Sequence, residues 1–334
     1  MTSEVVNKIS IKEIANTLGI STTTVSRTLS GKGRVGEDTK KRILDYIREN
    51  GYQPNVRRTN GLMKTGNICI TLPAEKDEAE LPFFSKIMLS IYDYFEARNY
   101  NIIPIKLKNT DITSLKKLVE KQKIDGVIFT RSIQESMGVQ YLQQQKIPFV
   151  IVGTYDDKTV WQVDADQENG CRELTSILLQ KGMRKIALLC ADRSHVVTRS
   201  RYKGFVKAFR ENDIPVDQSL IFDQVGEDAV ADKVIEDILK EQVECIVCMD
   251  EGICLSVLNK LRRDCVDVPR DIKLACFYNS WLLSSSVPSI TCVEFDAYEM
   301  GMEASKMLLD ILEGDTTPKR VVLGYQLMIK TSTQ

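Results

Sequence analysis

The sequence predicts a small all-α headpiece followed by a large α/β domain made of two doubly wound subdomains. Three helical patterns fill the first part of the chain, whereas short β-rich runs alternate with amphipathic helices in the rest. The chain of 334 residues is also longer than one compact core usually is. We therefore expect a headpiece over 1–58, a hinge segment over 59–66 and the large domain over 67–334.

The first predicted helix begins just after residue 10. Ser10 and Glu13 have the spacing of a capping box, in which each side chain satisfies a backbone N–H of the first turn. Gly19 ends the helix, because glycine tolerates the left-handed conformation of a helix end. The expected apolar face consists of Ile14, Ala15 and Leu18.

The second predicted helix follows after the tight turn 19–21. Ser21 can cap this helix, which covers 22–30 and turns Val25 and Leu29 toward the core. Two short helices joined by such a turn, with a third helix behind them, have helix-turn-helix geometry. The second helix can therefore lie in a major groove.

The third predicted helix begins near Glu37 and Asp38, whose charges suit the positive end of the helix dipole, and it ends at Gly51. Between Met1 and Gly66 the chain carries 12 Lys and Arg against 6 Asp and Glu, whereas the remainder carries 33 against 40. The basic end is therefore the candidate nucleic-acid face. The third helix continues through Ile43, Leu44 and Ile47.

The larger part of the chain shows repeated βα order. Strand-like runs begin at about residue 67, and the same order restarts at the run KIALLC, which predicts parallel sheets. We expect the chain to cross between the two halves more than once. The N-subdomain is assigned to about 67–160 and 292–322, and the C-subdomain to about 161–291 and 323–334.

Composition excludes several classes of protein. No stretch approaches the roughly 18 uninterrupted apolar residues of a membrane span, and the N-terminus lacks an apolar signal region, so we expect a cytoplasmic protein. The nine cysteines show no disulfide framework. His195 is the only histidine, which excludes a histidine-based metal site. Nucleotide-binding and nucleophile motifs are missing too, so we expect no enzyme, no catalytic residue, no cofactor and no metal.

The run ISIKEIANTLGISTTTVSRTLSGKGRVGEDTKKRILDYIRENGYQPN resembles the headpiece of the lactose-repressor (LacI/GalR) family of bacterial regulators. The likeness continues through RYKGF, MDEG, VPRDIKLACFYN and PSITCVEFDAYEMGMEASKMLLDIL, and it covers nearly the whole chain. The resemblance implies a sequence-specific DNA-binding regulator. Its effector domain would have the periplasmic-binding-protein-like fold, with two hinged α/β subdomains around a cleft.

In this family the start of the second helix reads bases, so the resemblance places Thr22, Thr23 and Arg27 in the specificity positions. Threonine offers a hydroxyl to a base edge and a methyl group to thymine, and arginine can bind guanine O6 and N7 bidentately. Ser26 lies near the same helical face and can reach the same groove. The hydroxyls expected at phosphate oxygens are those of Ser21, Thr24 and Ser30.

The family then has a hinge helix that enters the minor groove with a leucine wedge. The segment PNVRRTNGLMKTGN keeps Pro54 and Asn55, but Gly61 stands where that leucine is expected. Leu62 or Met63 could supply the wedge, although glycine costs roughly 1 kcal/mol in a helix. We count Asn55 and Leu62 among the DNA-binding residues. The alternative is a flexible basic linker with no inserted side chain.

Two polar residues stand where family members with sugar effectors hold hydroxyl groups. Arg201 of RYKGF can donate several fixed hydrogen bonds, and Asp250 of MDEG can accept from two adjacent hydroxyls. For the two tryptophans of the chain, core packing is the alternative to a ligand-binding role. The aromatic residues expected in the same pocket are Phe83, Phe84, Trp161, Tyr278 and Trp281.

Three polar positions of sugar-binding relatives have changed, to Gly153, Met249 and Tyr278. Such a pocket suits a less polar or bulkier ligand, an aromatic-stacked disaccharide or a phosphorylated sugar. A pocket that binds nothing is a further alternative. The sequence leaves the choice among these open.

The resemblance predicts a repressor of a carbohydrate-utilisation operon under allosteric control by a sugar or sugar phosphate. We expect a homodimer on a near-palindromic double-stranded operator, in which the effector closes the cleft and rotates the N-subdomains. The alternative is a global catabolite regulator whose DNA affinity is raised by a phosphorylated carrier protein. An α/β enzyme and a transport-type sugar-binding protein are the weaker rivals.

Overall fold

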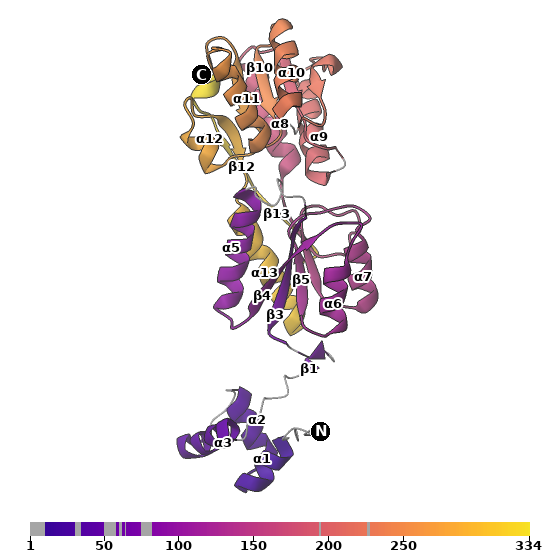
Figure 1. Cartoon of the computed structure of the whole chain (residues 1–334), viewed down its shortest axis with the longest axis vertical. Helices are drawn as coiled ribbons and strands as arrows, with labels where there is room; N and C mark the ends of the chain where they lie inside the picture. Colours follow the sequence, from indigo (N-terminus) through magenta and orange to yellow (C-terminus); the bar gives the residue numbers. More distant parts are fainter. Residues whose placement is uncertain are drawn as a thin grey trace, which may run out of the picture. The chain divides into compact units, whose positions relative to one another are not determined.

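The computed structural model divides into two compact units, Met1–Arg58 and Thr59–Gln334. Figure 1 traces the chain from the N-terminal helices to the C-terminal end of the second unit. The residues that the structure describes are 11–30, 35–49, 58–59, 62–63, 65–74, 82–193, 195–225 and 228–334.

Three helices make up the described part of the headpiece, as predicted (Figure 1). Leu18 and Ile47 pack against its buried core, whereas Leu44 is 41% exposed. Leu44 follows the buried Ile43, and successive helical residues point about 100° apart. The bounds are α1 (Ile11–Leu18), α2 (Thr22–Ser30) and α3 (Glu37–Glu49). The buried core consists of Ile14, Ala15, Val25 and Ile43.

The segment after the headpiece departs from the expected hinge helix. Arg58–Thr59 (β1) and Leu62–Met63 (β2) form a two-stranded sheet, so Leu62 belongs to a strand. The residues between the strands are Asn60 and Gly61, a pair typical of two-residue hairpin loops. We expected Gly61 only to weaken a helix, whereas the pair Asn60-Gly61 in the sequence favours a hairpin.

The first sheet of the second unit has the strand order β13-β7-β6-β5-β3-β4, with all strands parallel. The strands β5, β6 and β7 are buried along their whole length, as expected for a parallel sheet that is covered on both faces. The bounds are β3 (Asn67–Pro73), β4 (Asn101–Leu107), β5 (Gly126–Phe129), β6 (Phe149–Val152), β7 (Gln162–Ala165) and β13 (Arg320–Leu323).

Helices cover both faces of this sheet. Figure 1 shows α5 and α13 on one face and α6 and α7 on the other. Alternation along β3 explains the two layers, because Ile68 and Ile70 join the apolar cluster of Ile87 on α5, whereas Cys69 joins that of Leu115 on α6. The bounds are α5 (Pro82–Glu96), α6 (Thr113–Glu120), α7 (Met137–Gln145) and α13 (Ala297–Glu313).

The second sheet has the order β14-β12-β11-β10-β8-β9, with β14 antiparallel to β12 and the other strands parallel. Together with the first sheet it gives the two predicted α/β subdomains. The strands are β8 (Ile186–Leu189), β9 (Ile221–Phe222), β10 (Cys245–Cys248), β11 (Lys273–Cys276), β12 (Thr291–Glu294) and β14 (Gln326–Met328). The helices are α8 (Gln167–Gln180), α9 (Val196–Glu211), η1 (Gln218–Leu220), α10 (Asp228–Lys240), α11 (Glu251–Arg263), α12 (Trp281–Ser285) and η2 (Thr331–Thr333).

The chain passes from one sheet to the other a few residues later than the predicted subdomain boundaries. Strand β7 pairs with β6 in the first sheet, although we assigned the residues after 160 to the C-subdomain. Strand β12 pairs in the second sheet, although we assigned the residues from 292 to the N-subdomain. The chain crosses after β7, after β12 and after β13, because each of these strands first completes the sheet in which it pairs.

The cysteines pack as small core side chains. Eight of the nine are buried, and burial raises the pKa of the Cys245 thiol to about 12, so it stays protonated and unreactive at neutral pH. The described residues hold no group of three His, Cys, Asp or Glu side chains that could bind a metal ion. Among the described helices, none is long and apolar enough to cross a membrane.

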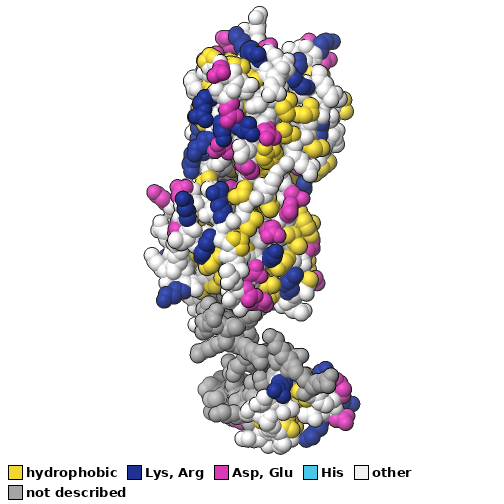
Figure 2. Space-filling view, turned by 180° about the vertical axis from the view of Figure 1, so that it is seen from behind, with side chains coloured by type: hydrophobic (Ala, Val, Ile, Leu, Met, Phe, Trp, Pro, Cys, Tyr) yellow, Lys and Arg dark blue, Asp and Glu magenta, His cyan; other side chains and the backbone are white. Residues whose placement is uncertain are grey.

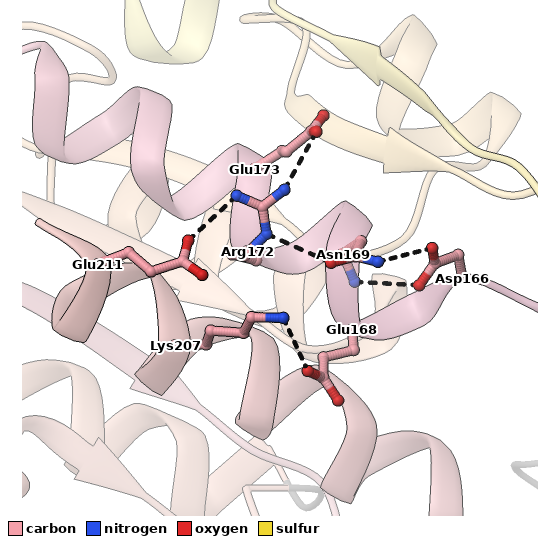
Figure 3. A network of polar contacts seen from close by, with 7 residues as sticks. All are labelled: Asp166, Glu168, Asn169, Arg172, Glu173, Lys207 and Glu211. Atoms are coloured by element: carbon pink, nitrogen blue, oxygen red, sulfur yellow. Dashed lines mark hydrogen bonds and ion pairs between the residues drawn. The ribbon is translucent and has the colours of Figure 1, made fainter.

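Helices α8 and α9 pack closely at Gly204. A methyl group there would lie 2.3 Å from the carbonyl oxygen of Glu168 and 3.0 Å from the backbone nitrogen of Arg172. Around this crossing Arg172 pairs with Glu211 at 3.2 Å and Lys207 pairs with Glu168 at 3.4 Å (Figure 3). These contacts hold α8 in place directly after the chain has crossed from the first sheet.

We expect Gly204→Ala to lower the free energy of unfolding by about 1–3 kcal/mol, the usual cost of overpacking, because the carbonyl of Glu168 is backbone and cannot rotate away. Urea unfolding followed by circular dichroism measures this change. Gly252→Ala is the matched control, since its added methyl group would lie 3.5 Å from Asp250 Oδ1. That variant should be at least as stable as the wild type, and equal losses in both would contradict the close packing.

Candidate nucleic-acid interface and ligand site

Two residues set the turn between α1 and α2. Gly19 has φ +65°, which glycine adopts at low cost, and the Ile20 N–H donates to the Ala15 carbonyl at 3.0 Å. Ser21 Oγ then accepts from the Thr24 N–H at 3.0 Å and caps α2. The predicted end of α1 and the predicted cap of α2 are both confirmed.

The outer face of α2 presents hydroxyl and guanidinium groups. Thr22, Thr23 and Arg27 are exposed, and the buried Val25 fixes the opposite side of the helix in the core. A short helix held in this way can place its first turns in a major groove. The other predicted DNA contacts lie outside the described side chains, namely Ser26, Ser30, Asn55 and Leu62.

Ser21 and Thr24, which we expected at phosphate oxygens, also have partners inside the headpiece. Their hydroxyls share a hydrogen bond of 2.8 Å. On α3, Arg42 donates to the Leu18 carbonyl at 3.3 Å and so links α3 to the end of α1. A hydroxyl that keeps one such bond can still form a second, so the phosphate role of both residues stays a prediction.

Asp125 fixes the start of the larger unit to its first sheet. Its carboxylate accepts from the N–H of Thr65 at 2.5 Å and from the N–H of Gly66 at 2.8 Å. We did not predict this residue, although an acidic side chain directly before the buried strand GVIF is a signal that could have found it. Both bonds hold the backbone where the chain enters β3.

The charge pattern of the larger unit differs from that of the headpiece. On the face that Figure 2 shows, Lys and Arg side chains are interspersed with Asp and Glu. The residues after Gly66 carry 33 Lys and Arg against 40 Asp and Glu. A surface of mixed sign does not attract a phosphate backbone as a basic surface does, which assigns the nucleic-acid interface to the headpiece.

Arg201 of α9 is a buried cation at the carboxyl edge of the second sheet. Its side chain is 8% exposed. The Nε atom donates to Gln167 Oε1 at 2.9 Å, and a terminal nitrogen donates to the Met249 carbonyl. The guanidinium carbon lies 5.8 Å from the ring centroid of Tyr278 and 5.9 Å from that of Phe295. Gln167 and Phe295 were not predicted, although each follows a strand whose carboxyl end lies here.

Asp250 lies next to this cluster and caps α11. Its Oδ1 accepts from the Ile253 N–H at 2.9 Å. Burial raises the pKa of Asp250, and the charge of Arg201 opposes that shift. The structure therefore brings Asp250 and Arg201 together, and it gives Asp250 a structural partner that we did not predict.

Two aromatic rings connect the subdomains. Phe83 of α5 lies 6.1 Å, centroid to centroid, from Tyr278, which follows β11, and the ring planes meet at 78°. Phe84 lies 5.3 Å from Phe83 and is buried in the core. Phe83 and Tyr278 thus belong to the candidate ligand site, whereas the buried Phe84 packs against Phe83.

The two tryptophans lie at different edges of the sheets. Trp161 precedes β7 at the amino edge of the first sheet, where Lys319 Nζ lies 2.9 Å from the centroid of its ring. Phe83 lies at the opposite, carboxyl edge. The predicted C-subdomain began at residue 161, but the chain leaves the first sheet only after β7. Trp281 begins the short helix α12, three residues after Tyr278, and is 66% exposed, so its ligand role stays a prediction.

Known regulators match the chain over both units. Residues 10–55 match bacterial regulatory proteins of the lacI family, and residues 175–333 match the periplasmic binding protein-like domain. The HTH-type transcriptional regulator RegA of Clostridium saccharobutylicum is 30% identical in sequence, over 97% of this chain and 99% of RegA.

Two solved structures share the fold. The transcriptional regulator CelR in its complex with cellobiose has a TM-score of 0.72 at 23% identity, over 97% of this chain and 100% of CelR. The lac repressor dimer bound to operator and the anti-inducer ONPF has a TM-score of 0.74 at 17% identity, over 98% of this chain and 99% of the repressor.

A helix-turn-helix headpiece joined to a periplasmic-binding-protein-like domain of two sheets defines a DNA-binding transcription regulator. The chain belongs to the LacI family of bacterial regulators, as the sequence resemblance implied. Its relatives are named as regulators and repressors of transcription, which confirms that the chain is not an enzyme.

Ser21→Ala should destabilise the headpiece by about 1 kcal/mol, because the N–H of Thr24 loses its capping acceptor. Hydrogen exchange of the headpiece amides in the full chain measures the loss as faster exchange. Thr23→Ala removes an exposed hydroxyl from the first turn of α2 and serves as control. It should leave exchange unchanged or slower, since alanine is the better helix former. Faster exchange of equal size in the control would argue against the cap.

Proposed function

We propose that the protein represses a carbohydrate-utilisation operon by reading its operator with α2. In this proposal Thr22, Thr23 and Arg27 contact base edges. The observation that carries the proposal is their joint exposure on a helix whose other side is fixed by Val25 and whose start is capped by Ser21. Each bidentate arginine contact with guanine gives about 1–3 kcal/mol of discrimination between bases.

The proposed regulator is a homodimer on a near-palindromic operator. Support comes from an apolar strip on α5, where Met88, Leu89 and Tyr92 are 37%, 55% and 51% exposed. Tyr298 of α13 extends the strip and donates to Asp93 at 2.9 Å. A second copy that lays the same strip against this one would bury these side chains symmetrically.

A sugar-type effector controls operator binding in this proposal. The facing rings of Phe83 and Tyr278, with Arg201 and Asp250 beside them, offer the combination of apolar faces and few fixed polar groups that ligand sites use. The similar regulator CelR is described in a cellobiose complex. A ligand that prefers one arrangement of the subdomains shifts operator affinity, typically by about 1–3 kcal/mol.

The segment 59–66 transmits the change in the proposed mechanism. Asp125 holds Thr65 and Gly66 on the N-subdomain, so rotation of this subdomain moves the backbone that leads to the headpiece. Asn55 and Leu62 remain proposed as further contacts with the operator.

Arg27→Ala should weaken operator binding by about tenfold to a hundredfold and random-duplex binding much less, because the lost contact reads a base. Fluorescence anisotropy at constant salt measures both affinities. Lys41→Ala removes an equal charge from the exposed surface of α3 and is the matched control, expected to weaken both duplexes alike and mildly. If Arg27→Ala reduced both affinities equally, base reading by Arg27 would be refuted.

Leu89→Glu should convert the dimer to a monomer, because it places a charge in the proposed apolar contact. Sedimentation velocity measures the assembly, and operator affinity should fall along with it. Met137→Glu changes a side chain of α7 that is 46% exposed on the other face of the sheet, and this control should stay dimeric. A dimer that survives Leu89→Glu would exclude the strip on α5 as the interface.

A further inference from the structure

Glu251, the first residue of α11, carries a buried carboxylate without a partner. Its side chain is 3% exposed, and neither Oε1 nor Oε2 has a hydrogen-bond partner in the part of the chain that the structure describes. Burial raises the pKa of this carboxyl group. Buried carboxylates in proteins are normally paired, because an unpaired one is strongly unfavourable.

The groups around Glu251 come from α5 and from the segment between β11 and α12, and none of them forms a hydrogen bond with its carboxylate. The Ser280 hydroxyl lies near enough to lower the pKa of Glu251, but neither carboxylate oxygen has a hydrogen bond of normal geometry with any described residue. Ser280 Oγ itself caps α12 by accepting from the Leu283 N–H at 3.4 Å. Lys86 of α5 lowers the same pKa through its charge, yet it is exposed and does not reach the carboxylate. Glu251 and Tyr278 follow the ends of β10 and β11, which pair side by side with Cys248 opposite Cys276, so both residues lie at the same edge of the sheet. Burial and then the charge of Glu251 raise the pKa of Tyr278.

Glu251 thereby lies in the ligand site described above. Tyr278 is the ring that contacts Phe83 and faces Arg201. The guanidinium of Arg201 already donates to a side-chain and a main-chain oxygen, and Asp250 already accepts the capping bond of α11. Glu251 differs from both, because its two oxygens are buried and both lack a donor.

We propose that Glu251 is the effector-binding carboxylate and that the effector presents two adjacent hydrogen-bond donors and no negative charge. This inference rests on the proposed function, since it specifies the ligand of the same site. An uncharged sugar supplies the donors as neighbouring hydroxyls, and an amino sugar supplies them as N–H groups. A phosphorylated sugar does not fit, because its phosphate would meet the carboxylates of Asp250 and Glu251.

The test uses the full chain and the variant Glu251→Gln, which keeps the shape of the side chain and removes its charge. Without ligand, Glu251→Gln should melt at or above the wild-type temperature, because an unpaired buried charge is lost. Cellobiose, glucosamine and glucose 6-phosphate are the three probes, scored by thermal shift and then by calorimetric titration. Glu241→Gln, an exposed carboxylate that follows α10, is the matched control.

We expect cellobiose or glucosamine, and not glucose 6-phosphate, to stabilise the wild type and Glu241→Gln. Binding to Glu251→Gln should be about tenfold to a hundredfold weaker, the usual range for hydrogen bonds to a charged group. A response to glucose 6-phosphate alone, an unchanged affinity in Glu251→Gln, or a lower melting temperature of this variant without ligand would each overturn the inference. Those results leave operator reading intact, whereas a wild-type chain without operator preference would overturn the proposed function itself.

Discussion

The parallel direction of the strands determines the positions of both the candidate ligand site and the crossovers between the subdomains. In each large sheet the segments that follow parallel strands gather at one edge. Gln167, Glu251 and Tyr278 follow three different strands and still meet at that edge. The chain also leaves the sheets there, after β7, β12 and β13. A ligand bound at this edge would therefore contact the crossover segments about which the subdomains can rotate. No further chain of contacts would be needed to couple binding to that rotation.

Three charged side chains of the candidate ligand site lie at this edge. Two of them form hydrogen bonds with other described residues, and one does not. Arg201 connects the crossover residue Gln167 with the main chain after β10, so its guanidinium is a structural link in addition to its proposed role as a donor to a ligand. Asp250 begins a helix. The carboxylate of Glu251 forms no such bond within the part of the protein that the structure describes. Because its hydrogen-bond acceptors are unused there, its chemistry is the best guide to the kind of ligand that binds.

Local rules predicted the headpiece well, because its turn and cap depend on neighbours in sequence. Gly19 and Ser21 act within four residues of themselves, and periodicity placed Val25 in the core. Positions that depend on distant contacts were harder. Trp161 was misplaced because its edge of the sheet depends on where β7 begins and ends, and Glu251 was missed because a lack of partners exists only in three dimensions. The strand of Leu62 was missed for another reason, since the family resemblance outweighed the local Asn60-Gly61 signal.

Among the described residues, the apolar cluster of the headpiece consists of headpiece side chains such as Ile14 and Val25. If the proposed base contacts of α2 hold, operator preference is encoded in a short stretch of chain that recombination can exchange as one unit, without rebuilding the effector domain that follows it. A lineage of such regulators can then acquire new target genes while keeping its chemical stimulus, or keep its targets while the stimulus drifts, and the two halves of the molecule can carry separate evolutionary histories.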